Sequence, residues 1–114
     1  FLKTSDLFTI SILILGFCAL NLQGKVDFNR QIRPILSDKC FKCHGPGAKN
    51  QKSDFRIHSF EEAIKEHNGF VGLTPGNLEE SEIHWRIYSD DAIDVMPPPE
   101  SKHPLTEAEK KLID

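Results

Sequence analysis

The sequence predicts an all-α fold in which short helices are joined by long loops that wrap a bound group. Apolar residues recur at helical spacing in several segments, and most of these segments follow a capping residue. No segment shows the alternation of apolar and polar residues that is typical of a half-buried strand. The loops are long for so small a chain, and loops of this kind usually serve a function or enclose something.

The first 24 residues differ in composition from the rest. Residues 7–22 carry no charge and are mostly apolar, and Lys3 is the only basic residue before them. This run is short for a transmembrane helix, which needs about 20 residues, but it suits the apolar region of a secretory signal peptide. We therefore expect residues 1–24 to be a signal peptide or signal anchor. Residues 25–114 would then be the folded domain, as a fragment of a larger exported protein.

The predicted domain can bury only a modest hydrophobic core. A covalently held apolar group would supply much of what is missing. The formal net charge of −3 gives no indication of nucleic acid binding.

The first helix is predicted from Asp27 onwards. Asp27 is a suitable N-cap, and apolar residues follow it at one-face spacing: Phe28, Ile32, Ile35 and Leu36. Pro34 should kink this helix or restart it from a first turn. The helix leads into Cys40, and residues 45–47 (Gly-Pro-Gly) then break the chain.

Three more helices are predicted from capping boxes. Ser59 with Glu62 opens a short helix that we expect residues 68–69 (Asn-Gly) to end. Asn77 with Glu80 opens a helix that runs to about residue 90. In the same way, Thr106 with Glu109 opens a final helix.

Residues 40–44 read C-x-x-C-H, which is the attachment motif for c-type haem. Cys40 and Cys43 can each form a thioether to one haem vinyl group, and His44 can bind the iron as the proximal ligand. The other ring nitrogen of His44 should donate to a backbone carbonyl group, which would fix the orientation of the ring. The motif therefore predicts one haem c per chain.

Met96 is the candidate for the second axial ligand. Its thioether is a soft ligand suited to haem iron, and it lies in a proline-rich segment, residues 94–104, which cannot be helical. The other reading is a methionine that fills a gap in the core. The remaining histidines are expected on the surface or on helix faces: His58, His67, His84 and His103.

Two arginines are candidates for contacts with the haem propionates. The guanidinium groups of Arg56 and Arg86 suit a carboxylate in geometry and charge, although a solvated arginine is the other reading for each. Trp85 is expected in ordinary helix packing. Lysines around the attachment motif form either a solvated face or one that orients an electron-transfer partner.

Together these motifs resemble the planctomycete-type cytochrome c module. The shared patterns are K-C-H-G-P (42–46), P-G-x-x-x-x-S-x-I-x-x-R-I (75–87), S-D-D-x-x-x-V-M-P-P-P (89–99) and L-T-x-x-E (105–109). Residues 26–40 are similar to the first helix of that family, whereas residues 51–58 match it loosely. The resemblance implies a class I-like cytochrome c fold with His44 and Met96 as axial ligands.

The sequence therefore predicts a monohaem c-type cytochrome module that carries single electrons and is not itself an enzyme. Its partner would be a redox protein or downstream domains of the same chain, and only the N-terminal segment would touch a membrane. We expect the module in the periplasm, or anchored in the inner membrane and facing the periplasm.

Two other readings of C-x-x-C remain. One is a zinc- or other metal-binding module that uses Cys40, Cys43 and histidines, although the second ligand pair typical of a zinc ribbon does not stand out. The other is a thiol–disulfide protein, which would need a βαβ context that the pattern does not show.

Overall fold

The computed structural model describes residues 24–49 and 53–114, so the predicted signal segment lies almost wholly outside the described residues. Within the described part, no helix is long and apolar enough to cross a membrane. The elements, in chain order, are η1 (Phe28–Ile32), α2 (Arg33–Lys39), α3 (Phe41–His44), α4 (Phe60–Ala63), β1 (Glu66–His67), β2 (Phe70–Val71), α5 (Glu82–Tyr88), η2 (Pro99–Ser101) and α6 (Glu107–Ile113).

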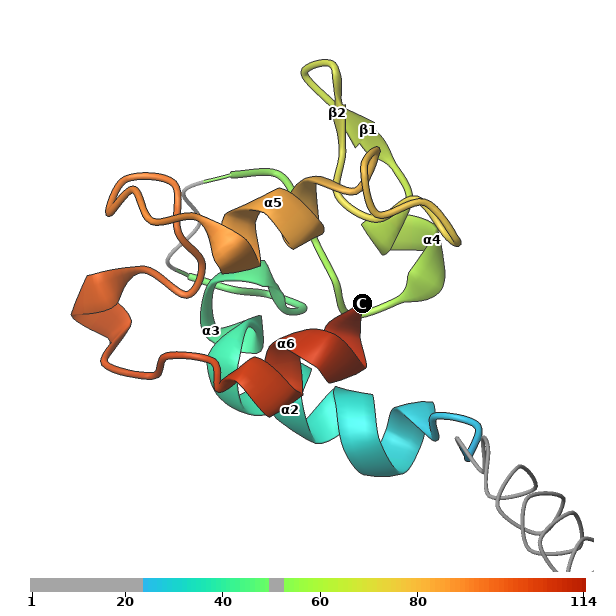
Figure 1. The fold of residues 1–114 in the computed structure, drawn as a ribbon. Coiled ribbons are helices and arrows are strands. Elements are labelled where there is room, and N and C mark those ends of the chain that lie inside the picture. Colours follow the sequence, from blue (N-terminus) through green and yellow to red (C-terminus); the bar gives the residue numbers. More distant parts are fainter. Residues whose placement is uncertain (1–23, 50–52) are drawn as a thin grey trace, which may run out of the picture.

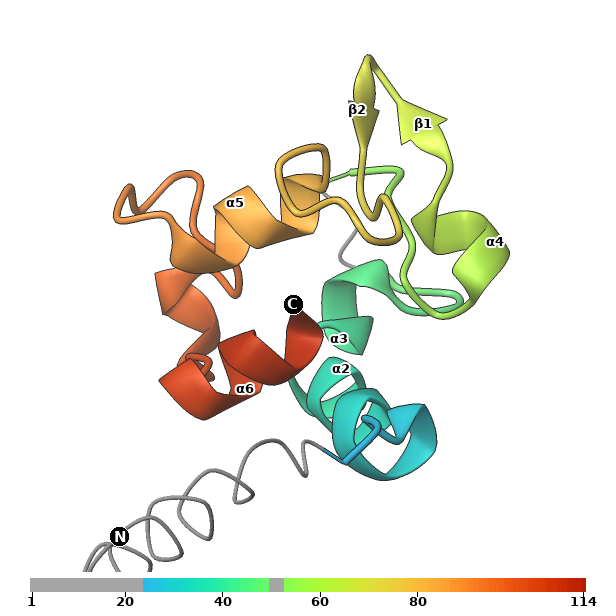
Figure 2. The same cartoon turned by 45° about the vertical axis from the view of Figure 1, so that its right-hand side comes forward.

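The short helices surround a common centre. Figures 1 and 2 both show α6 alongside α2, with α5 on the other side of α6. The β1–β2 hairpin projects from the far end of the molecule, next to α4. The C-terminal end of α6 reaches α5, where Asp114 Oδ2 accepts a hydrogen bond from the Tyr88 hydroxyl at 2.9 Å.

The N-terminal helical region begins and restarts as predicted. The Asp27 side chain accepts from the Arg30 backbone N–H at 3.1 Å, and the first turn, η1, is π-helical. The α-helix α2 then starts at Arg33 with Pro34 in its first turn, where a missing N–H costs no helical hydrogen bond. Of the two outcomes expected for Pro34, a kink or a new first turn, the structure shows the new first turn.

The predicted break after the attachment motif is confirmed. Helix α3 ends at His44, and the N–H of Gly45 donates to Phe41 O at 2.9 Å. A Cβ at Gly45 would lie 2.5 Å from that same oxygen, so a side chain cannot be accommodated there. Glycine at this position lets the chain leave the helix directly after His44.

A small hairpin corrects the prediction of an all-α fold. Helix α4 begins after Ser59 as expected, but it ends at Ala63, before the predicted stop. Asn68 and Gly69 instead form the turn between β1 and β2, with φ of 54° and 85°. Asn-Gly is the preferred pair for such a two-residue hairpin turn, because both positions need positive φ. Strands of two residues are too short to show alternation in the sequence.

Helix α5 is shorter than predicted. The Asn77 side chain does accept from the Glu80 N–H at 3.2 Å, but the helix begins only at Glu82 and ends at Tyr88. The buried Ser81 hydroxyl contacts Asn77 O at 2.7 Å and accepts from the Thr74 N–H, which holds residues 74–81 as a compact turn. The proline-rich segment contains one short 3-10 turn, η2, where no helix was expected.

The hydrophobic core is small. Within the described residues, five apolar side chains are buried: Ile35, Leu36, Ile57, Ala63 and Ile87. Leu36, Ile57 and Ala63 form one cluster, and Cys40 packs against it. Several large apolar side chains remain exposed, including Phe60, Phe70, Trp85 and Ile93. The protein part alone thus buries little apolar surface, as expected for a domain that folds around another group.

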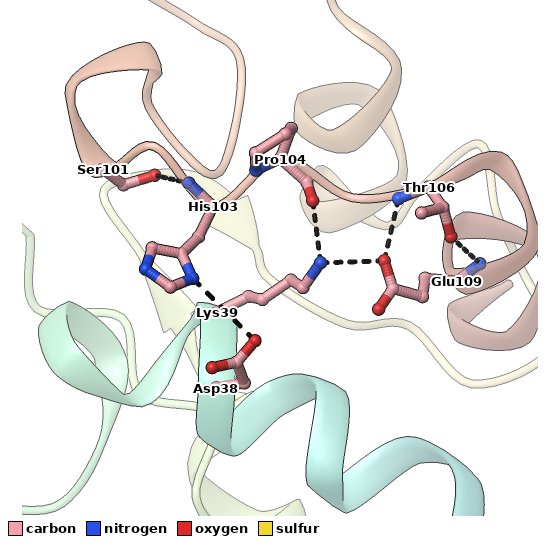
Figure 3. Close-up of polar contacts among 7 residues, drawn as sticks. All are labelled: Asp38, Lys39, Ser101, His103, Pro104, Thr106 and Glu109. Atoms are coloured by element: carbon pink, nitrogen blue, oxygen red, sulfur yellow. Dashed lines mark hydrogen bonds and ion pairs between the residues drawn. The ribbon is translucent and has the colours of Figure 1, made fainter.

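A polar cluster joins α2 to α6 and to the segment before α6 (Figure 3). Lys39, at the end of α2, donates from Nζ to Pro104 O at 2.7 Å and pairs with Glu109 Oε2 at 2.9 Å. Glu109 also accepts from the Thr106 N–H, while Thr106 Oγ1 accepts from the Glu109 N–H. This is the predicted capping box, and it is confirmed.

A second, looser contact lies beside this cluster. His103 Nδ1 is 3.9 Å from Asp38 Oδ2, and both side chains are more than half exposed. The backbone N–H of His103 donates to Ser101 Oγ at 3.3 Å. An exposed pair at this distance contributes little to stability.

Neutralising Glu109 should remove a pH-dependent part of the stability. The Thr106 backbone N–H, together with Lys39, holds the pKa of this carboxyl below its usual value of 4.5. The stabilisation is therefore complete above pH 4.5 and is lost as pH falls through the lowered pKa. We expect Glu109→Gln to be less stable than wild type at pH 7, by less than about 1 kcal/mol, with the gap closing in acid. Urea denaturation at pH 3–7 measures this gap.

The matched control is Lys39→Met. At pH 7, Lys39→Met should destabilise the wild-type protein more than it destabilises the Glu109→Gln variant. The reason is that the Lys39–Glu109 ion pair is already lost in that variant. Equal effects in both backgrounds would contradict the pairing.

Candidate haem site

The two thiols and the imidazole of the attachment motif lie on one turn of helix. Cys40 links α2 to α3, and its carbonyl accepts from the Cys43 and His44 N–H groups at 3.2 and 2.8 Å. Residues three positions apart on a helix share a face. Both cysteines are free and half-buried, so two thiols stand side by side with the histidine next in the chain.

The imidazole of His44 is held by the segment that follows. Its Nδ1 lies 3.1 Å from the Phe55 carbonyl oxygen, and its backbone carbonyl accepts from the Ile57 N–H at 3.0 Å. A carbonyl oxygen can only accept, so Nδ1 carries the proton and Nε2 keeps its lone pair for a metal. Phe55 O is the carbonyl that the sequence alone did not identify, and it lies in the loosely matching segment.

Phe55 is itself fixed by close packing. Its ring lies 5.4 Å from the His44 ring, centroid to centroid. On another side, a Cβ placed on Gly72 would lie 1.9 Å from Phe55 Cε2. Only glycine at position 72 leaves room for this ring.

Gly72→Ala should therefore destabilise the domain and disturb His44. Overpacking of this kind costs about 1–3 kcal/mol, and displacement of Phe55 would also move the carbonyl that orients the imidazole. Thermal unfolding measures the first effect. If Gly72→Ala were as stable as the wild type, the packing of Phe55 on Gly72 would be wrong.

Burial protects one of the thiols. It raises the pKa of Cys40 to about 11, and this effect outweighs the opposing influence of Lys39. The thiol is therefore protonated at neutral pH and reacts slowly with oxidants.

Met96 lies on a loop that is tied to α5. Its backbone N–H donates to Arg86 O at 3.0 Å, and the preceding Val95 N–H donates to Asp91 O at 2.8 Å. The Met96 side chain is half-buried. These hydrogen bonds add to the stiffness that the prolines were expected to give.

The two candidate arginines bond to groups of the protein. Arg56 Nη1 donates to the Ser53 and Phe55 carbonyls at 2.9 and 2.7 Å. Arg86 pairs through Nε with Glu82 and through Nη1 with Asp94, at 2.9 and 3.0 Å. The second pair fastens the chain next to Met96 onto α5. A propionate contact stays a prediction for both arginines.

Other aromatic and basic residues have their own partners. Trp85 is 58% exposed and its indole N–H donates to Glu79 O at 2.9 Å, so the expectation of ordinary helix packing was wrong. His84 Nδ1 lies 2.9 Å from Asp114 Oδ1. Lys39 is engaged in the α2–α6 cluster, so it is not a free charge for a redox partner.

A cavity of about 320 Å³ lies near α5 and the end of α6. Its walls come from the loop after β2, α5 and α6, and include Leu73, Leu78, Ile83 and Ile113. None of the attachment residues lines it. The cavity therefore does not by itself mark where the predicted group is held.

The family model described as Planctomycete cytochrome C matches residues 40–100, which is more than half of the chain. The chain belongs to this family. The matched span begins at Cys40 and includes the Phe55 segment, α5 and Met96. The resemblance predicted from the motifs is thereby confirmed. Comparisons with curated proteins and with solved structures found no match.

Membership of the planctomycete cytochrome c family implies covalently bound haem c and haem-based electron transfer. The residues fit such a group: two free thiols share a helical turn, and the neighbouring imidazole presents Nε2. In the described residues, no group of three or more His, Cys, Asp or Glu side chains could hold a metal ion. The family match decides between the haem and zinc readings.

Proposed function

We propose that this chain is a monohaem c-type cytochrome module with His44 and Met96 as axial ligands. One observation carries the proposal. His44 directly follows the free thiol of Cys43, and its Nδ1 is bonded to Phe55 O. Its Nε2 is therefore the nitrogen available to iron. When bound, the haem supplies the exchange of a single electron.

The residues of the chain would divide the work of holding this group. Cys40 and Cys43 would carry the two thioether bonds, while His44 presents Nε2 in an orientation set by Phe55. Met96 would present its sulfur from a loop fastened to α5 at Arg86 O. A ligand held in place before binding loses less conformational entropy when it coordinates.

The proposal extends to the setting of the module. Residues 25–114 would form one cytochrome domain behind a signal peptide or anchor, as the apolar run at 7–22 supports. The domain would lie in the periplasm, free or anchored in the inner membrane. It would exchange electrons with a redox protein or with further domains of its own chain, and would not bind nucleic acid.

Expression of the whole chain in a host that exports proteins and ligates haem tests the proposal. We expect a red product in the periplasmic or membrane fraction, with one haem per chain by mass spectrometry. Its colour should survive acid–acetone extraction, because thioethers hold the group. A colourless, zinc-loaded product from the same host would overturn the proposed function.

A further inference from the structure

The outer face of α5 carries an exposed tryptophan. Trp85 is 58% exposed, whereas Ile87 is buried and Ile83 packs against the core cluster. Residues two positions apart on an α-helix point about 200° apart, so the Trp85 side chain leaves α5 on the side away from the core. A group held inside the domain would therefore leave Trp85 uncovered.

The position of this indole ring is fixed. Its N–H donates to Glu79 O at 2.9 Å, and the ring packs edge-on against His84, with centroids 5.7 Å apart. Leu78, which precedes Glu79 in the chain, is also exposed. Tryptophan is enriched among the residues that contribute most to protein–protein binding, because it offers a large contact area at a low cost in conformational entropy. The outer face of α5 thus has the features of a docking surface.

The same tryptophan is joined to the proposed axial ligand by a short path. Arg86 follows Trp85 in α5, and Arg86 O accepts from the Met96 N–H at 3.0 Å. Electrons transfer faster where covalent and hydrogen bonds, rather than gaps, connect the donor with the acceptor. A partner in contact with Trp85 would reach Met96 through the backbone of Arg86 and one hydrogen bond.

Carboxylates gather around this surface. Residues 77–95 contain six acidic side chains but only one lysine or arginine, Arg86. The acidic residues are Glu79, Glu80, Glu82, Asp90, Asp91 and Asp94. Arg86 pairs with two of them, so the charge of this segment stays negative. The lysines near the attachment motif have no comparable apolar neighbour, because no large apolar side chain is exposed in the described span 39–49.

We propose that Trp85 and these six carboxylates, the acidic α5 surface, form the docking surface for a redox protein with a positively charged contact face. The inference rests on the proposed function and specifies the chemistry of its partner. One electron would pass between the two redox centres, with no bond formed and no proton moved. Opposite charges steer such an encounter, and electron-transfer partners typically meet through small interfaces.

Oxidation of the ferrous holoprotein, full chain, by tris(phenanthroline)cobalt(III) tests the surface. This cation has an aromatic exterior, and it becomes cobalt(II) when it takes one electron from the iron. In stopped-flow measurements, we expect the rate to fall as salt is added, and to fall by roughly threefold or more in the double variant Glu79→Gln/Glu80→Gln. Poly-L-lysine, a cationic chain of protein size, should inhibit the reaction of the wild type more than that of this variant.

A second double variant is the matched control. Glu61→Gln/Glu66→Gln removes the same charge from exposed positions in α4 and β1, and it should leave the rate near the wild-type value. Equal slowing in both double variants would show an effect of total charge, and an unchanged rate in Glu79→Gln/Glu80→Gln would show none. Either result, in a red protein, overturns the inference alone. A colourless product overturns the proposed function and the inference with it.

The role of the indole is measured at high salt, where surface charges are screened. We expect Trp85→Ala to slow the cobalt reaction severalfold and Trp85→Phe, which keeps an aromatic ring, to slow it less. Phe70→Ala removes an equally exposed ring from β2 and should change nothing. The reduction potential of each variant is measured as well, so that rates are compared at equal driving force. Wild-type rates in Trp85→Ala would overturn the role of this residue as the contact.

Discussion

Replacing Cys40 and Cys43 together by alanine should abolish covalent haem attachment. Both thioether bonds need a thiol, and no other cysteine follows residue 43. We expect any residual haem to be extracted by acid acetone. The domain should also become markedly less stable, because only five apolar side chains of its described part are buried. Absorption spectra after extraction, together with thermal unfolding, measure both effects.

Cys18→Ala is the matched control for this experiment. Cys18 lies outside the described residues, in the apolar run that we predict to be a signal peptide or signal anchor. It should leave haem attachment unchanged. Covalent haem in the double variant would show that another residue carries the bond, and the attachment role of Cys40 and Cys43 would then be wrong.

Met96→Ala should open one coordination position at the iron and lower the reduction potential. A thioether favours ferrous iron, so its loss favours the ferric state. We expect the potential to fall by more than about 59 mV, which is a tenfold shift for a one-electron couple. Cyanide or carbon monoxide should also bind quickly. Spectroelectrochemistry and ligand-binding kinetics check the two effects.

Exposed histidines provide the controls for the axial ligand. His58→Ala and His103→Ala should leave the iron six-coordinate and the potential unchanged, because both residues are exposed. An unchanged spectrum in Met96→Ala, with a changed one in either histidine variant, would move the ligand role from Met96 to that histidine.

The features that the sequence predicted correctly depend on short stretches of chain. Asp27, Ser59 and Thr106 each accept a backbone hydrogen bond from a residue three positions later. The attachment motif likewise needs only one helical turn. Such patterns can be recognised locally, because all the interacting groups lie within a few residues of one another.

The features that were missed need contacts between distant residues or have an ambiguous local signal. Asn68-Gly69 suits both a helix end and a hairpin turn, and only the short pairing of β1 with β2 decides for the hairpin. The carbonyl that holds His44 lies 11 residues further along the chain. The pairing of Arg86 with Asp94 was not visible either, because it depends on how the loop before Met96 folds back. The pairing of Arg86 with Glu82 is different, because residues four positions apart in a helix are neighbours and can be recognised locally.

The ion pair between Lys39 and Glu109 has a consequence for the order of folding. It joins residues 70 positions apart, so it closes a ring of chain that includes nearly every other element. A haem bound at both His44 and Met96 would connect the two halves of this ring, so that only roughly 20 residues separate Lys39 from Glu109 through the haem. The entropic cost of forming the ion pair would then fall by about 1 kcal/mol. Helix α6 should therefore dock late and rapidly in the holoprotein, and slowly in the protein without haem.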